Sequence, residues 1–147
     1  MEQTLTENQN PDKPWYVAAN GIAASVFLAF LTTAGIFYIN IMPAVVSGLV
    51  DGLGFTSQQA GYVSSANLYG ASVGALAAVF AIKHIRWRLW SFGLMLAILL
   101  IDFSSTFIAQ PLAMIALRGL HGLLGGLLVG IGFGIISRTT DPDKTFG

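Results

Sequence analysis

Four long apolar stretches follow one another along the chain, and short polar segments separate them. The stretches run from about residue 17 to 49, 58 to 82, 87 to 107 and 111 to 138. A membrane-spanning α-helix needs about 20 mostly apolar residues, so each stretch is long enough to cross a bilayer. The first exceeds one crossing, and we expect it to tilt, to kink at Pro43 or to extend beyond the bilayer. The pattern predicts an all-α, polytopic membrane protein with four transmembrane helices.

The polar segments agree with these boundaries. Thr56 is followed three residues later by Gln59, the spacing of a capping box, and Pro111 suits a first helical turn. Residues 1–16 are polar and contain two prolines, which is typical of a disordered tail. They lack the basic start and the cleavage site of a secretory signal peptide, so we expect the first apolar stretch to remain in the mature protein as a helix.

The placement of lysine and arginine predicts the orientation of the four helices. Six of the seven basic residues lie before the first stretch, between the second and third, or after the fourth: Lys13, Lys83, Arg86, Arg88, Arg138 and Lys144. The other two connections contain no lysine or arginine. Because basic loops remain in the cytoplasm, both termini should be cytoplasmic, and residues 139–147 should form a cytoplasmic loop.

Composition supports the membrane class and excludes several kinds of function. The 147 residues are 54% hydrophobic and 10% charged, with a mean hydropathy of +0.71, whereas soluble domains carry roughly 25% charged residues. There is no cysteine, and the two histidines, His84 and His121, lie far apart, so we expect no metal site and no cofactor. No basic cluster suggests nucleic acid, and no nucleophile, paired acids or phosphate-binding loop suggests an enzyme.

Small residues recur every four positions along two of the predicted helices. The glycines in question are Gly70 and Gly74 in the second helix, and Gly122, Gly126, Gly130 and Gly134 in the fourth. Such a stripe lets another helix approach closely, and helix packing is its commonest meaning. We therefore interpret these glycines as packing positions.

Arg118 is the one basic residue that lies far from the ends of its apolar stretch, and it must face protein or water. Three interpretations are open. The side chain extends to the outer interface, or it forms a static pair with Asp102, which lies at a similar depth in an antiparallel neighbour. Alternatively it binds an anionic group or modulates the protonation of a nearby carboxylate.

Other polar residues lie within the predicted spans. His121 is three residues after Arg118 on the same helix face, where it could hydrogen-bond, line a cavity or relay protons. Asn20, Tyr38, Asn40 and Asn67 are further polar positions in the first two helices. A cation and polar groups inside a packed bundle favour transport over simple anchoring.

The fourth helix resembles the start of a major facilitator superfamily (MFS) transporter. The family motif places an arginine before a Gln–Gly pair and small residues; here Arg118 is followed by His121-Gly122, with histidine in place of glutamine. Asn40-Ile41-Met42-Pro43 resembles the family's Asn-x-x-Leu-Pro element. The segment with Lys83, Arg86 and Arg88 is similar to a degenerate form of its loop between helices 2 and 3, with Ile82 where the family has aspartate.

The resemblance implies helices 1–4 of an N-terminal six-helix bundle, with further helices as partners. It also implies a secondary transporter of a small solute in a bacterial inner membrane, working by alternating access and driven by a proton or another ion. In that family the arginine is associated with proton coupling. Substrate and coupling candidates are then Arg118, Asp102, His121, Asn20, Asn40 and Asn67.

Two other interpretations remain open from the sequence. One is a complete four-helix protein that transports as an oligomer, although the first helix lacks the acidic residue that small multidrug exporters carry there. The other is a membrane subunit or assembly protein without transport activity, in which the glycines of the fourth helix form a docking face.

Overall fold

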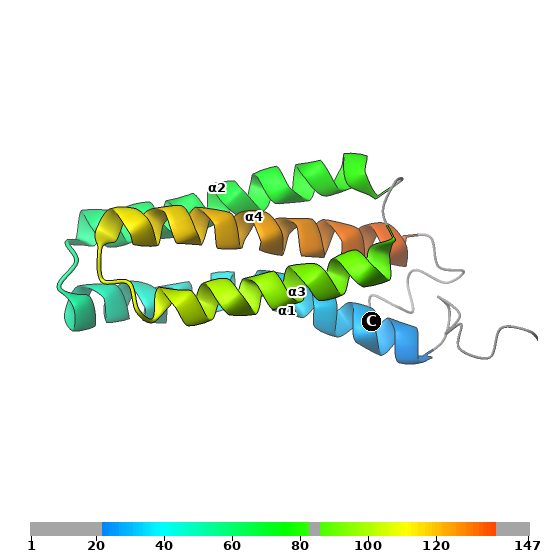
Figure 1. The fold of residues 1–147 in the computed structure, drawn as a ribbon, viewed down its shortest axis with the longest axis horizontal. Helices are drawn as coiled ribbons and strands as arrows, with labels where there is room; N and C mark the ends of the chain where they lie inside the picture. The colour runs from blue at the N-terminus through cyan, green and yellow to red at the C-terminus, as the bar shows by residue number, and fades with distance from the viewer. Residues whose placement is uncertain (1–21, 83–85, 138–147) are drawn as a thin grey trace, which may run out of the picture.

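The computed structural model describes residues 22–82 and 86–137, and four long helices account for most of them. They are α1 (Ile22–Ser47), α2 (Ser57–Ala81), α3 (Trp87–Ser105) and α4 (Pro111–Ile136). The helices run antiparallel to their neighbours in the chain, so the bundle has two ends (Figure 1). Each helix, α1 together with the turn that follows it, provides a segment long and apolar enough to span a membrane. This confirms the predicted all-α membrane fold. The expected tail, Lys83 and the closing loop lie outside the described residues.

The helix boundaries follow from local chemistry. α1 continues through Pro43 and passes into a π-helical turn at Gly48–Gly52, where the Ser47 hydroxyl donates to Asp51 Oδ2 at 2.8 Å. Gly54 then reverses the chain with a φ of +70°, a left-handed conformation that glycine adopts without steric cost.

The connection between α1 and α2 ends in the capping box that the sequence predicts. Thr56 Oγ1 accepts from the Gln59 backbone N–H at 3.2 Å, and Gln59 Oε1 accepts from the Thr56 N–H at 2.9 Å. Two backbone donors at the helix start are thereby satisfied, which fixes where α2 begins.

α4 is the central helix of the bundle. It contacts all three others, most extensively α2, and lies between α2 on one side and α1 and α3 on the other (Figure 1). The glycines of both helices face each other's backbone: a Cβ at Gly74 would collide with the Leu123 carbonyl, and one at Gly122 with the Asn67 carbonyl. The two helices therefore approach as closely as their backbones allow.

α4 uses a second set of glycines against α1. A Cβ at Gly125 would lie 2.9 Å from the Gly35 carbonyl oxygen, and one at Gly132 would meet the Thr32 methyl group. Glycines on two faces thus allow α4 to pack closely between two helices at once. This packing fixes the depth at which the polar side chains of α4 meet those of its neighbours.

Buried apolar side chains form two separate clusters, one toward each end of the bundle. The cluster nearer the start of α1 consists of Leu28, Leu31, Ala78, Leu94, Leu128, Ile131, Ile135 and Ile136. The cluster nearer the α1–α2 connection consists of Leu49, Phe55, Ala60, Val63 and Met114. On α1, α2 and α4, the polar residues described below lie between residues of these two clusters.

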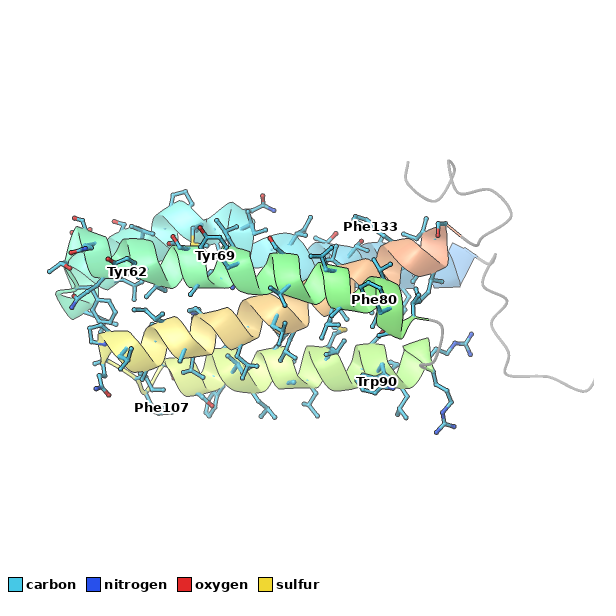
Figure 2. All side chains as sticks on the ribbon, turned by 90° about the horizontal axis from the view of Figure 1, so that it is seen from above. Tyr62, Tyr69, Phe80, Trp90, Phe107 and Phe133 are labelled. Atoms are coloured by element: carbon cyan, nitrogen blue, oxygen red, sulfur yellow. The ribbon has the colours of Figure 1, made fainter. Side chains whose placement is uncertain are left out.

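The outer surface of the bundle is apolar. Large side chains such as Tyr69, Phe80, Trp90 and Phe107 point away from the bundle (Figure 2), and each is more than half exposed. A soluble protein rarely exposes so much contiguous apolar surface. Hydrocarbon chains of lipid would cover these side chains, as the membrane-length helices require.

Candidate functional site

A cluster of polar side chains from all four helices occupies the layer between the two apolar clusters. Its members are Tyr38 from α1, Asn67 from α2, Asp102 and Ser105 from α3, and Arg118 and His121 from α4. We call these six residues the polar cluster. Arg118 lies seven residues into α4, about 10 Å along the helix axis, so the cluster lies well inside the membrane-length segments.

The Arg118 guanidinium is held on three sides. Nη1 lies 2.6 Å from Asp102 Oδ1, and Nη2 donates to Ser105 Oγ at 2.9 Å. The Tyr38 ring lies against the guanidinium, with Cζ 4.7 Å from the ring centroid, a cation–π arrangement. The arginine side chain is only 11% exposed. Arg118 therefore pairs within the bundle, and its side chain does not extend to the interface.

His121 continues the cluster toward α2. Its Nε2 lies 3.4 Å from Asp102 Oδ2, and its Nδ1 lies 3.1 Å from Asn67 Nδ2. The same Asn67 nitrogen donates to the Arg118 carbonyl oxygen at 3.1 Å. Tyr38 packs against the imidazole with ring centroids 5.1 Å apart. His121 and Asn67 are both buried, so these contacts replace the water that each group would otherwise bind.

A cavity of about 310 Å³ opens beside the polar cluster, between α1, α3 and α4. Its polar lining is Tyr38, Asp102, Ser105, Thr106, Arg118 and His121. Apolar side chains of α1 and α3, such as Phe37, Ile41 and Ile98, complete the wall. The Asp102 side chain is 46% exposed. The carboxylate is thus the member of the ion pair that a solute or a water molecule reaches first.

The charges of the cluster determine what it can bind. Arg118 and Asp102 together are neutral, so the resting pair has no net attraction for an anion or a cation. Two buried atoms in the cluster lack a hydrogen-bond partner, Tyr38 Oη and Arg118 Nε. Arg118 Nε can only donate, whereas a hydroxyl can donate or accept. Within the described residues, no three His, Cys, Asp or Glu side chains meet in a way that could hold a metal ion.

The structure brings four of the sequence candidates together: Arg118, Asp102, His121 and Asn67. Asn40 is exposed on α1 and does not line the cavity, and Asn20 lies outside the described residues. Arg86 directly precedes α3 and Arg88 is the second residue of this helix. Both lie at the opposite end of α3 from Asp102. The glycines interpreted as packing positions contact α2, α4 or, for Gly134, the side chain of Ile82.

Two contacts of the cluster were not anticipated from the sequence. Ser105 was not singled out, although it follows Asp102 by three residues and so shares its helix face. Tyr38 was recognised only as a polar position, and its stacking on Arg118 and His121 depends on the approach of α1 to α4. The three-residue spacing from Asp102 is the sequence signal that identifies the serine.

Comparison with known protein families identifies a relationship over most of the chain. Residues 35–144, three quarters of the chain, match the family model described as "Uncharacterised MFS-type transporter YbfB". The match covers the second half of α1 and all of α2, α3 and α4, including every residue of the polar cluster. No curated protein and no solved structure matches the chain. With four membrane-length helices and this family match, the chain is an integral membrane protein that belongs to the MFS transporter family.

Proposed function

We propose that the chain contributes the polar cluster of an MFS-type secondary transporter that moves a small solute by alternating access. The observation that carries this proposal is a nearly buried arginine, paired with a half-exposed carboxylate, beside an open cavity inside membrane-length helices. Ionisable groups in such a position are costly in lipid and typically mark substrate or ion pathways. In this proposal the protein is a transporter and not an enzyme.

The pairing of Arg118 with Asp102 suggests how solute and proton movement are coupled. An anionic group can use the guanidinium fully only when Asp102 no longer neutralises it, which protonation of the carboxylate achieves. Asp102 is the one carboxylate among the described residues of α2, α3 and α4. We infer that binding of an anionic or hydrogen-bond-accepting solute at Arg118 accompanies protonation of Asp102.

Further helices complete the transporter in this proposal. MFS transporters consist of two six-helix halves that rock about a substrate site near the middle of the membrane. The apolar outer faces of the bundle (Figure 2) suit both lipid and such neighbouring helices. The basic residues favour an orientation with both termini in the cytoplasm, and the resemblance to MFS transporters suggests a bacterial inner membrane.

The alternative of a non-transporting subunit has less support. It treats the glycines of α4 as a docking face for a partner. Gly122, Gly126 and Gly130 already pack against α2, and Gly125 and Gly132 pack against α1. These two faces are therefore occupied within the chain. In an assembly protein the ion pair would be structural only, and the cavity beside the half-exposed Asp102 carboxylate would have no role.

The test is transport by Arg118 and Asp102 variants of the intact transporter in proteoliposomes that contain a pH-sensitive dye. A panel of small carboxylates and neutral solutes is added outside, and solute-dependent proton entry is recorded. We expect Arg118→Ala and Asp102→Asn to abolish the signal while membrane insertion is unchanged. Ser104→Ala is the matched control, because this neighbouring hydroxyl is exposed and bonds only to the Leu100 carbonyl. Normal proton-coupled transport by well-inserted Arg118→Ala would refute the proposal.

A further inference from the structure

The Asn67 side-chain amide lies between two acceptors at the contact of α2 with α4. Its nitrogen is 3.1 Å from the Arg118 carbonyl oxygen and 3.1 Å from His121 Nδ1. An amide nitrogen carries two protons and no lone pair available for hydrogen bonding, so it can only donate. Asn67 is 2% exposed, and water does not compete for these bonds.

The Arg118 carbonyl fixes which way the amide points. If the Asn67 side chain were rotated by a half turn, its Oδ1 would face the carbonyl oxygen, and two acceptors would lie in contact without a proton between them. The amide nitrogen therefore faces His121, and His121 Nδ1 must offer a lone pair to it. The second ring nitrogen, Nε2, then carries the imidazole proton and faces Asp102 Oδ2 at 3.4 Å.

The charges around His121 oppose one another, because the Asp102 carboxylate would stabilise an imidazolium and the Arg118 guanidinium would disfavour it. The charged or titratable groups around His121 are Asp102 from α3, Arg118 from α4 and Tyr38 from α1, while α2 contributes the neutral Asn67. The Asp102 carboxylate already neutralises Arg118 at 2.6 Å. A second proton on His121 would leave a net positive charge inside the bundle and would place an N–H against the amide N–H.

We propose that Asn67 is a positioning residue that holds His121 as the neutral tautomer protonated on Nε2. His121 then directs a proton donor at Asp102 and does not itself carry a proton during transport. This role in coupling rests on the proposed transport function, whereas the tautomer does not depend on it. Both acceptors of the Asn67 amide lie on α4, so Asn67 acts across the contact between α2 and α4.

The tautomer is measured by ¹⁵N magnetic resonance of histidine-labelled protein in lipid bilayers at about pH 8, above the range in which free imidazole changes its charge. A His84→Gln variant leaves His121 as the one histidine and assigns its signals. We expect one protonated nitrogen, Nε2, and one unprotonated nitrogen, Nδ1. A proton on Nδ1 would overturn the proposal.

The role of Asn67 is tested by replacing its amide with an apolar side chain of similar size. In Asn67→Leu we expect His121 to lose its single tautomer and to show a population with protonated Nδ1. Asn40→Leu is the matched control, because Asn40 is exposed and lies outside the cavity; its His121 spectrum should equal that of the parent protein. An unchanged spectrum in Asn67→Leu would show that the amide does not set the tautomer.

Transport by His121→Gln tests the consequence for coupling. Glutamine offers an acceptor to Asn67 and a donor to Asp102, but it does not take up a proton near neutral pH. We expect proton-coupled transport with an unchanged pH profile in this variant, and a loss of at least tenfold in His121→Leu, which can do neither. A transport-competent parent whose His121→Gln variant loses coupling would contradict the neutral role. If the parent itself does not transport, the proposed function fails while the spectrum still decides the tautomer.

Discussion

The Arg118 guanidinium is tolerated inside the bundle because three different groups replace its water. The Asp102 carboxylate supplies the opposite charge, Ser105 accepts a hydrogen bond, and the Tyr38 ring covers one face. A buried ion pair is not by itself a large source of stability, since desolvation of both ions opposes their attraction. Removal of one of the two ions is costly, however, because the other ion is then buried without a partner.

This asymmetry gives a prediction for the ion pair. Asp102→Ala leaves Arg118 11% exposed and without its counter-ion, and it should lower the free energy of unfolding by about 3 kcal/mol. The double variant Asp102→Leu/Arg118→Leu removes both charges and should be markedly more stable than Asp102→Ala. Unfolding in mild detergent measures both. Equal destabilisation by the single and double variants would mean that the orphaned charge is not the cause.

The double variant also separates the two roles that the sequence leaves open for this pair. A purely structural pair predicts that the double variant keeps transport once it is folded. A pair that binds solute or proton predicts a folded protein without transport. We expect the second result, because Asp102 lines the cavity with a half-exposed carboxylate.

At the scale of the helices, backbone proximity between α2 and α4 sets the geometry of the polar cluster. Asn67 reaches the Arg118 carbonyl across this contact, and that is possible only because Gly70 and Gly122 bring the two backbones together. A wider spacing would leave the amide and the imidazole apart. The glycines thus have an indirect part in the site, through the distance that they permit.

Alanine substitutions at two glycines of α2 test this contact. A Cβ at Gly74 would collide with the Leu123 backbone carbonyl, which cannot rotate away, whereas a Cβ at Gly61 meets nothing within 4 Å. We expect Gly74→Ala to lower the free energy of unfolding by about 1–3 kcal/mol. Gly61→Ala should be neutral or raise it by up to about 1 kcal/mol, since alanine favours helix. Thermal unfolding in detergent measures both, and similar effects at the two sites would contradict close packing.

The helices were predictable from the sequence, but most of their mutual contacts were not. Length and hydropathy fix a membrane helix locally, and the capping box at Thr56 marks its own helix start. The similar depth of Asp102 and Arg118 also follows from the short connection between antiparallel helices. Asn67, in contrast, meets partners more than 50 residues away. The Asn67 amide carries no local sequence signal that identifies its partners. The glycine stripes show that a helix packs closely but do not show which helix it meets.

For the whole molecule, the polar cluster lies nearer the end of the bundle that carries the connections from α1 to α2 and from α3 to α4 (Figure 1). Arg86 and Arg88 lie at the opposite end, with the start of α1 and the end of α4. Because basic residues favour the cytoplasmic side, the cluster should lie in the half of the membrane away from the cytoplasm. A solute arriving from outside would then meet Asp102 before it crosses the larger apolar cluster.

Cysteine labelling tests this orientation without a background signal, since the chain contains no cysteine. Gly52 ends the π-helical turn after α1 and Ser137 caps the end of α4; both are exposed. A membrane-impermeant maleimide should label Gly52→Cys in intact cells, and Ser137→Cys only after permeabilisation. The reverse pattern would invert the orientation and place the polar cluster on the cytoplasmic side. Labelling of both positions from outside would contradict the arrangement itself, because the antiparallel helices put these two residues at opposite ends of the bundle.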